Sequence, residues 1–306
     1  MIPQLDEFLT FDDSAIRSLV AAVGFPQLGV FVPDGSRRLV LSFTDVEPDT
    51  EEYYRLSATL PAEHLLAALS VFFDCGLPIL LVPILSSSVL RRGSEYRQLT
   101  ALTGLQLLFD SPAWRDFYHD YDIRVAIYGN PDLLVGTECE PALGWIRETC
   151  SATASHATHV LYFAIGESPS VGDGIADLGI EFFRRNGRAP SLPELMKMVY
   201  GAELPPADFF IMTSKISGMG ALPRFVVNGD TRIYFLPSAG AMGLNAQTYR
   251  TILHDMIYNR DAMAHGYHEG AWTDGDRTIL REYYQRSVMT VIGVNERLGN
   301  VAVPKW

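Results

Sequence analysis

Short apolar runs alternate with longer amphipathic segments along most of the chain, and this alternation limits the possible folds more than any other feature. The runs predict strands at residues 28–32, 39–43, 79–85, 123–128, 160–165, 209–212 and 232–236. The spacing of apolar residues predicts helices at 53–75, 95–109, 112–120, 172–186, 192–200, 246–260 and 275–297. Strands that alternate with helices form a largely parallel sheet covered on both faces. We therefore expect an α/β fold with a mostly parallel central sheet flanked by helices.

The chain contains no repeat, low-complexity segment or convincing linker that would divide it. Its 306 residues are 48% hydrophobic and 20% charged, which is typical of a globular protein. The Gly/Pro-rich stretches at 187–193 and 217–223 are typical of loops. We therefore expect a single domain over residues 1–306.

Several features predict a cytoplasmic protein with no integral membrane segment. No apolar run reaches the roughly 18 residues that a transmembrane helix needs. The first residues are acidic, unlike the basic start of a signal peptide. The three cysteines, Cys75, Cys139 and Cys150, form no CxxC pair and suggest a reducing compartment.

The charge balance excludes one class of partner. The chain has 24 Lys and Arg against 36 Asp and Glu, a net charge of −12. Such a protein should not bind nucleic acid through its overall field. If it binds an anion, positive charge must be supplied locally.

One candidate for such a local charge is the stretch Asp34-Gly35-Ser36-Arg37-Arg38, which directly follows the predicted strand 28–32. Ligands of parallel α/β sheets bind at the carboxyl ends of the strands. In a functional interpretation, Asp34 is a metal ligand or an orienting acid, and Arg37, Arg38 and the N–H groups of the turn hold a phosphate. The alternative is a solvated strand connection in which acid and arginine pair on the surface.

These residues resemble the first motif of the cis-prenyltransferases, which runs Asp-Gly-Asn-x-Arg-Trp. Asp34, Gly35 and Arg38 match it, whereas Ser36 and Leu39 depart from it. Weaker matches follow in the same order at 84–92, 122–130, 207–216 and 233–240. The resemblance implies that fold for a core of about 27–260, with a C-terminal helical extension at 261–306. It also implies a homodimer whose interface includes 207–260, and a magnesium ion (Mg2+) supported by Asp34.

The departures from this family concern its site for isopentenyl diphosphate. Met212 and Ile216 replace an Arg and a Glu, and Gly218 and Gly220 stand where an Arg and a Ser are expected. Methionine cannot replace a bidentate guanidinium, and isoleucine cannot ligate magnesium. Val89 replaces an Asn of the second motif. The pattern therefore indicates that the allylic diphosphate site is retained and the isopentenyl diphosphate site is lost, although Lys215 offers partial replacement of the missing charge.

This pattern resembles a narrower branch, the tuberculosinol/isotuberculosinol synthases and tuberculosinyl transferases. Their first motif is Asp-Gly-Thr-Arg-Arg, and their acid-acid-Tyr and Arg-Gly-x-x-Tyr motifs match 51–53 and 92–96 here. The resemblance implies a class I-type diterpene synthase that expels diphosphate from a bicyclic diterpenyl diphosphate and quenches the cation by water or proton loss. Terpentetriene synthase performs a related elimination. The implied catalytic residues are Asp34 and Tyr53, and the implied diphosphate-binding residues are Gly35, Ser36, Arg37, Arg38 and Arg92.

Other interpretations stay open at this stage. The enzyme could transfer its diterpenyl group to a nucleophile such as adenosine, or be a non-catalytic subunit, or elongate a chain with isopentenyl diphosphate. Arg92 could instead cap a surface helix. Tyr53, Phe72, Phe73 and Tyr128 are candidates for the cation-lining pocket, although Phe72 and Phe73 fit a plain core better. Asp12 fits a helix N-cap better than a metal motif.

Overall fold

The computed structural model describes residues 3–167, 174–213, 223–259, 273–287, 295–298 and 301–304. The chain forms two compact units, one over Phe11–Ala246 and the other over Met1–Thr10 together with Gln247–Trp306. Each unit is described by itself below. The single domain over residues 1–306 stays a prediction.

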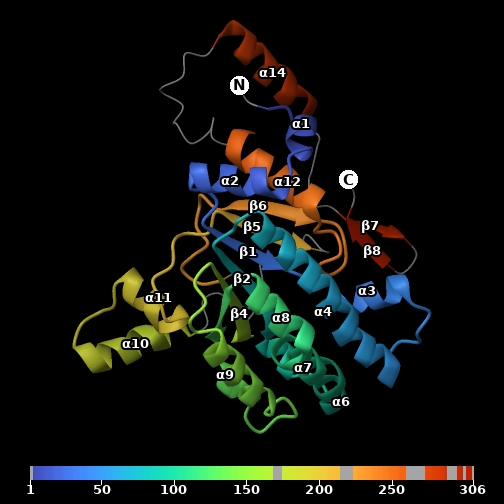
Figure 1. Cartoon of the computed structure of the whole chain (residues 1–306), viewed down its shortest axis with the longest axis vertical. Coiled ribbons are helices and arrows are strands. Elements are labelled where there is room, and N and C mark those ends of the chain that lie inside the picture. The colour runs from blue at the N-terminus through green and yellow to red at the C-terminus, as the bar shows by residue number, and fades with distance from the viewer. Residues whose placement is uncertain are drawn as a thin grey trace. The chain divides into compact units, whose positions relative to one another are not determined.

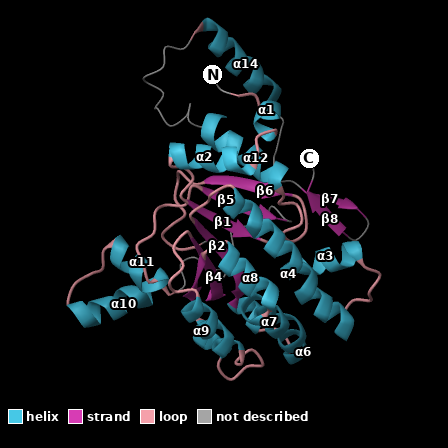
Figure 2. Ribbon diagram, in the orientation of Figure 1, coloured by secondary structure: helices cyan, strands magenta, loops and turns pink. Residues whose placement is uncertain are grey.

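The larger unit is built on a six-stranded sheet in the order β3-β4-β2-β1-β5-β6 (Figure 1). The strands are β1 Leu28–Val32, β2 Ile79–Ser86, β3 Ile123–Gly129, β4 His159–Glu167, β5 Phe209–Thr213 and β6 Arg232–Leu236. Every neighbouring pair is parallel, and helices flank the sheet (Figure 2). This confirms the predicted α/β fold with a parallel central sheet.

Apart from α2, which precedes β1, the helices of this unit lie between the strands in the sequence, as expected for parallel connections. They are α2 Asp13–Val23, α3 Ser36–Phe43, α4 Glu51–Asp74, α5 Ser87–Leu90, α6 Ser94–Tyr96, the π-helix η1 Arg97–Leu102, α7 Thr103–Asp110, α8 Pro112–Asp120, the 3₁₀ helix η2 Pro131–Leu134, α9 Ala142–Ala152, α10 Ile175–Asn186 and α11 Leu192–Tyr200. Asp12 caps α2, since its carboxylate accepts a hydrogen bond from the Ala15 N–H at 2.7 Å. The cap prediction is therefore confirmed.

The strand predicted at residues 39–43 is wrong, because this segment belongs to α3. Leu39 and Val40 are buried, whereas Leu41 and Phe43 are 47% and 58% exposed. Periodicity alone cannot distinguish a strand from a short helix in such a brief apolar run. The helix begins directly after the Asp34-Gly35 turn, so the turn is joined to a helix N-terminus and not to a second strand.

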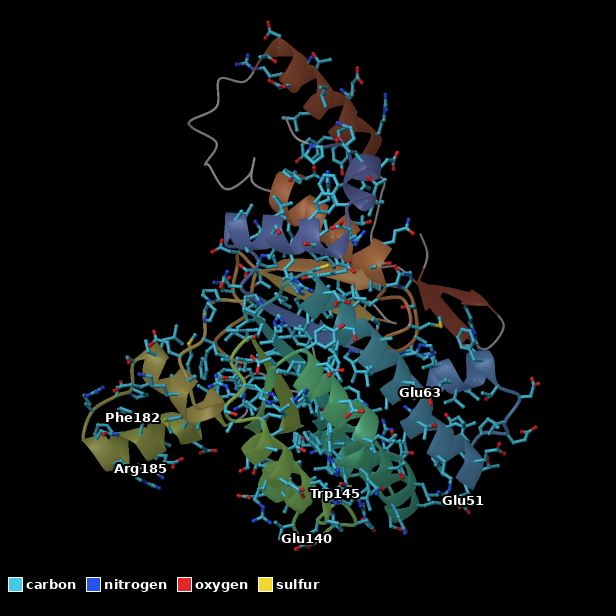
Figure 3. The ribbon with its side chains drawn as sticks, in the orientation of Figure 1. Glu51, Glu63, Glu140, Trp145, Phe182 and Arg185 are labelled. Atoms are coloured by element: carbon cyan, nitrogen blue, oxygen red, sulfur yellow. The ribbon has the colours of Figure 1, made fainter. Side chains whose placement is uncertain are left out.

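Helix α4 packs its apolar side against one face of the sheet. The Phe72 ring stacks on Phe209 with ring centroids 5.9 Å apart and meets Phe31 at 5.4 Å. Gly29 makes room for this contact, because a Cβ there would lie 2.1 Å from the Phe209 ring. Glu51 and Glu63 lie on the solvent side of α4 (Figure 3).

By length and composition, α4 is also the one helix among the described residues that could cross a membrane. Leu69, Phe72 and Phe73 of this helix are completely buried in the protein. The apolar core helix of a globular protein meets the same criteria, so this is weak support for a membrane span.

The opposite face of the sheet packs against α11. Side chains alternate along a strand, so Val30 and Phe210 point away from α4 and join the Met196 and Tyr200 side chains. The Tyr128 ring lies 5.2 Å from that of Tyr200 in the same cluster. This face holds a second layer of core.

The smaller unit contains α1 Leu5–Leu9, most of α12 Ala246–His254, η3 Asp255–Asn259, α14 Asp274–Ser287 and the antiparallel strands β7 Asn295–Leu298 and β8 Val301–Pro304. Phe8 packs edge-on against His254 at 5.3 Å. The helix predicted at 275–297 ends at Ser287, and its last residues fall in β7 instead. A strand pair therefore follows the helical part of the predicted extension.

Candidate active site

A cavity of about 800 Å³ lies where β1 and β2 end, with α3, α4 and the η1–α7 helix forming its walls. All the site residues predicted from the sequence line it, namely Asp34, Gly35, Ser36, Arg37, Arg38, Tyr53 and Arg92. Its volume lies within the range of small-molecule binding sites. The structure therefore brings these residues together, while their chemical roles stay predictions.

The turn after β1 is shaped to present backbone N–H groups. Gly35 has a φ of 98°, a left-handed conformation that glycine adopts without strain. Its N–H donates to the Asp34 carboxylate at 2.7 Å, and α3 then begins at Ser36 without a side-chain cap. The first N–H groups of a helix have no intrahelical partner and attract anions. This end of the cavity can therefore accept a phosphate group.

Contacts from two other segments hold the turn in place. The Asp34 carbonyl accepts hydrogen bonds from the Gly240 N–H at 2.7 Å and from the Thr213 hydroxyl at 3.0 Å. The Asp34 carboxylate also pairs with the Arg38 guanidinium at 3.2 Å, one helical turn away. The turn is thus fixed to β5 and to the chain after β6.

Positive side chains outnumber negative ones in this cavity. Its lining includes the guanidinium groups of Arg37, Arg38 and Arg92 against the carboxylate of Asp34. Within the described residues, Arg37 is exposed and forms no ion pair. In a protein with a net charge of −12, this local excess of positive charge meets the requirement for an anion site.

Arg92 lies in the loop between α5 and α6, so the structure favours a cavity position over a helix cap. Its guanidinium stands 4.5 Å from the centroid of the Tyr96 ring, a cation–π contact. Its carbonyl accepts a hydrogen bond from Arg97, whose Nη2 is 3.0 Å from the Glu138 carboxylate. The loop that carries Arg92 is therefore anchored by an ion pair.

Tyr53 is buried on the first turn of α4 and lines the cavity. Burial raises the pKa of its hydroxyl, and the positive charges of Arg37 and Arg92 oppose this only in part. The phenol therefore keeps its proton at neutral pH and can donate a hydrogen bond. The neighbouring Tyr54 donates to Asp49 at 3.2 Å and is not part of the cavity lining.

The rest of the cavity is mostly aliphatic, and among the described residues Tyr53 and Tyr96 are the aromatic side chains in its lining. Two helical stripes face it, Ser57, Ala58, Pro61, Ala62 and Leu65 on α4 and Thr100, Ala101, Gly104, Leu105 and Leu108 on η1 and α7. Both stripes repeat at i, i+1, i+4, i+5 and i+8, the spacing of one helix face. Sequence reasoning missed these residues, although the small side chains at this spacing were a usable signal.

Three of the aromatic residues proposed for the pocket lie elsewhere. Phe72 and Phe73 are completely buried in the core, as their spacing favoured. The proposal for Tyr128 is wrong, because its ring packs with Tyr162 and Tyr200 in the cluster around α11. Alternation along β3 places this side chain on the face of the sheet away from α4.

The segment 207–216, which departs from the family motif, has residues at both ends of β5. Asp208 lies directly before β5, where its carboxylate accepts hydrogen bonds from the N–H groups of Gln27 at 2.6 Å and Leu28 at 3.0 Å. It therefore supports the amino end of β1, at the end of the strands opposite the cavity. Met212 and Val89 line the cavity. The residues Ser214, Lys215, Ile216, Gly218 and Gly220 lie outside the described residues.

The donor set at this site limits the metals that it can hold. The described part of the chain contains no group of three or more His, Cys, Asp or Glu side chains placed to hold a metal. Magnesium commonly binds one or two protein carboxylates together with substrate phosphates. Asp34, the carboxylate in the cavity lining, fits that kind of site.

Comparisons with known proteins agree with the resemblance drawn from the motifs. No family model matches the chain. The chain is 25% identical to a tuberculosinyl adenosine transferase from Mycobacterium tuberculosis, over 94% of each chain. It is 23% identical to a (+)-kolavelool synthase from Herpetosiphon aurantiacus, over 99% of this chain and 95% of the relative. The similarity to the tuberculosinyl and diterpene synthase group is thus confirmed along nearly the whole length.

Proposed function

We propose that this protein is a diterpene synthase that ionises a cyclic or bicyclic diterpenyl diphosphate, releases diphosphate and quenches the allylic cation by water or proton loss. The observation that carries this proposal is the division of the cavity. Three guanidinium groups and a helix N-terminus lie at one end, and two stripes of mostly small or aliphatic side chains line much of the rest. An amphiphile with a diphosphate head and a hydrocarbon body matches this arrangement.

The first step breaks the carbon–oxygen bond of the substrate, and the bonding electrons leave with the diphosphate. Positive groups placed where negative charge develops lower the barrier for this step. Arg37, Arg38 and the N-terminus of α3 line the cavity and would supply this positive charge, and Arg92 would add a third cation. Each contact of this kind contributes on the order of 3 kcal/mol.

Asp34 and Tyr53 have supporting roles in the proposal. Asp34 orients Arg38 through its ion pair and would hold a magnesium ion, which adds positive charge to the leaving group when bound. Tyr53 keeps its proton, so it donates a hydrogen bond and does not act as a base. The aliphatic side chains of the two stripes surround the cation with groups that cannot attack it.

A transferase is the second candidate, because one of the two relatives carries the name of a transferase. In that case the cation is trapped by a nucleophile such as adenosine. Both names support an enzyme, and they do not distinguish a lyase from a transferase. A non-catalytic subunit is less favoured, since it would have no need to gather Asp34 and three arginines in one cavity. We further propose a cytoplasmic homodimer, on the family resemblance alone.

Product analysis with a panel of geranylgeranyl, labdane-type and clerodane-type diphosphates tests the proposal. Diphosphate release and product masses are measured with magnesium, in the presence and absence of nucleosides. We expect diphosphate release from one cyclic substrate. In Asp34→Ala, we expect the rate of this release to fall at least 100-fold. Asp116→Ala, which changes an exposed acid on α8, is the matched control. Undiminished turnover by Asp34→Ala contradicts the proposal, and nucleoside adducts favour the transferase.

A further inference from the structure

One hydroxyl in the aliphatic part of the cavity has no partner. Ser57 lies one helical turn after Tyr53 on α4, lines the cavity and is 3% exposed. Its Oγ forms no hydrogen bond in the described structure. Buried polar groups are nearly always hydrogen-bonded, to protein or to ordered water. This hydroxyl therefore indicates a ligand.

The backbone beside Ser57 supplies a second polar group. Pro61 stands four residues later inside α4 and also lines the cavity. Proline has no N–H, so the usual helical hydrogen bond to the Ser57 carbonyl cannot form. Ser57 thus offers both a hydroxyl and a carbonyl that lacks its usual helical donor, on one turn of the helix.

The facing wall adds a third polar group. Thr100 lies on the π-helix η1, is 8% exposed and lines the cavity. Its hydroxyl donates to the Tyr54 carbonyl at 2.8 Å, on the turn of α4 that leads to Ser57. A hydroxyl that donates once still has lone pairs that accept. Short π-helical segments are frequent at functional sites.

We propose that Ser57 and Thr100 hold the water molecule that ends the reaction, so that the enzyme forms an alcohol. This inference rests on the function proposed above and decides between its two ways of quenching the cation. A buried water needs two to four polar partners and enough room. The Ser57 hydroxyl, the Ser57 carbonyl and the Thr100 hydroxyl supply the partners. Gly104 in the facing wall leaves room, because a Cβ there would meet no atom within 4 Å.

Capture of the cation by this water needs no further reactant. The water donates its hydrogens to the Ser57 carbonyl and the Thr100 oxygen and keeps a lone pair for the cation. That lone pair forms the new carbon–oxygen bond, and the resulting oxonium loses one proton to the released diphosphate, the strongest base left in the cavity. Diterpenyl diphosphate and water thus give a diterpenol and diphosphate. Loss of this water would leave proton loss to an olefin as the remaining route.

The test compares Ser57→Ala with the wild type in ¹⁸O-labelled water. We expect the ratio of labelled alcohol to olefin to fall about tenfold, a larger change than in the rate of diphosphate release. Thr100→Val should shift the ratio in the same direction. Ser70→Ala is the matched control, because Ser70 lies on the same helix and its hydroxyl donates to the Leu66 carbonyl at 3.1 Å. That control should keep the wild-type ratio.

Different results would contradict the proposed synthase function and the proposed water site. Absence of diphosphate release by the wild type counts against the proposed function. An unchanged alcohol ratio in both variants, or a wild type that makes only olefins or nucleoside adducts, overturns the water proposal. A crystal structure of the wild type gives a readout that does not depend on activity. An ordered water bonded to Ser57 and Thr100 supports the proposal, and its absence overturns it.

Discussion

The two ends of the cavity are built in opposite ways. The anion-binding end is concentrated in residues 34–38, which run from the turn after β1 into the first turn of α3. The aliphatic end is spread over α4, η1 and α7, which no short motif spans. Charge and backbone N–H groups can be gathered in one turn, whereas an apolar wall needs many side chains from several elements. The first end is therefore visible as a motif, and the other is visible only as helical spacing.

Removing charge from the anion-binding end should have the largest effect. We expect Arg37→Ala to lower the kcat/KM for diphosphate release by about 100-fold to 1000-fold, because it removes a positive charge that would lie beside the leaving diphosphate. Arg55→Ala is the control, since Arg55 is exposed on α4 and pairs with Glu51 at 2.8 Å. A loss below about threefold in Arg37→Ala would show that this end does not stabilise the leaving group.

Filling the aliphatic end should have the next largest effect. Ala62→Phe places a ring among the small side chains of α4, so we expect about a 10-fold to 100-fold loss with a bicyclic substrate. The loss should be smaller with geranyl diphosphate, whose hydrocarbon is shorter. Ala67→Phe, on the exposed side of the same helix, controls for the new ring. Equal losses for both substrates would place the hydrocarbon outside this stripe.

Tyr53 lies between the two ends and should have an intermediate effect. We expect Tyr53→Phe to lower the rate of diphosphate release about tenfold, the value of one hydrogen bond to a charged group. Burial raises the pKa of Tyr53 above 10.0, so its contribution should persist through neutral and mildly alkaline pH and disappear only on deprotonation above that value. The pH–rate profiles of wild type and variant check this.

The Tyr53 experiment has a close control in Tyr121→Phe. The Tyr121 hydroxyl also donates a hydrogen bond, to Asp74 at 2.9 Å, but it is not in the cavity lining. The Tyr121→Phe variant should keep the wild-type rate of diphosphate release. If both variants lose activity equally, the effect of Tyr53 is structural and not catalytic.

The conformation of the anion-binding turn can be tested through stability. Gly35→Ala places a side chain at a φ of 98°, which costs about 1–2 kcal/mol in the free energy of unfolding. Gly179→Ala within α10 should have the opposite sign and stabilise by about 1 kcal/mol, because a Cβ there meets no atom within 4 Å. Urea unfolding of both variants measures the difference. Equal stability of Gly35→Ala and wild type would argue against the left-handed turn.

The smallest expected effect concerns a carboxylate far from the cavity. Hydrogen bonds from the Thr158 hydroxyl and from the N–H groups of Ala157 and Thr158 lower the pKa of Asp122 to about 2. Its contribution to stability is therefore present above about pH 4 and is lost as the pH falls towards about 2. The melting temperatures of wild type and Asp122→Asn should differ at about pH 5 and converge near pH 2.

The sequence predicted the sheet well because buried parallel strands are continuous apolar runs, as in β1 and β5. The prediction failed at 39–43, because so short an apolar run does not distinguish the two-residue period of a strand from the 3.6-residue period of a helix. It located Asp34 and its arginines because their chemistry is local. It placed Tyr128 in the pocket wrongly, since the face on which a strand residue lies depends on register. Ser57 was invisible as a site residue, because its importance comes from Pro61 and Thr100 around it.

The hydrogen bond from the Gly240 N–H to the Asp34 carbonyl gives the protein a built-in spectroscopic probe. Its donor lies far along the chain from the anion-binding turn, yet it reports on the position of that turn. Occupation of the turn by inorganic diphosphate should slow hydrogen–deuterium exchange at this amide and shift its NMR resonance. Binding of this reaction product can thus be followed without turnover and without a chromophore.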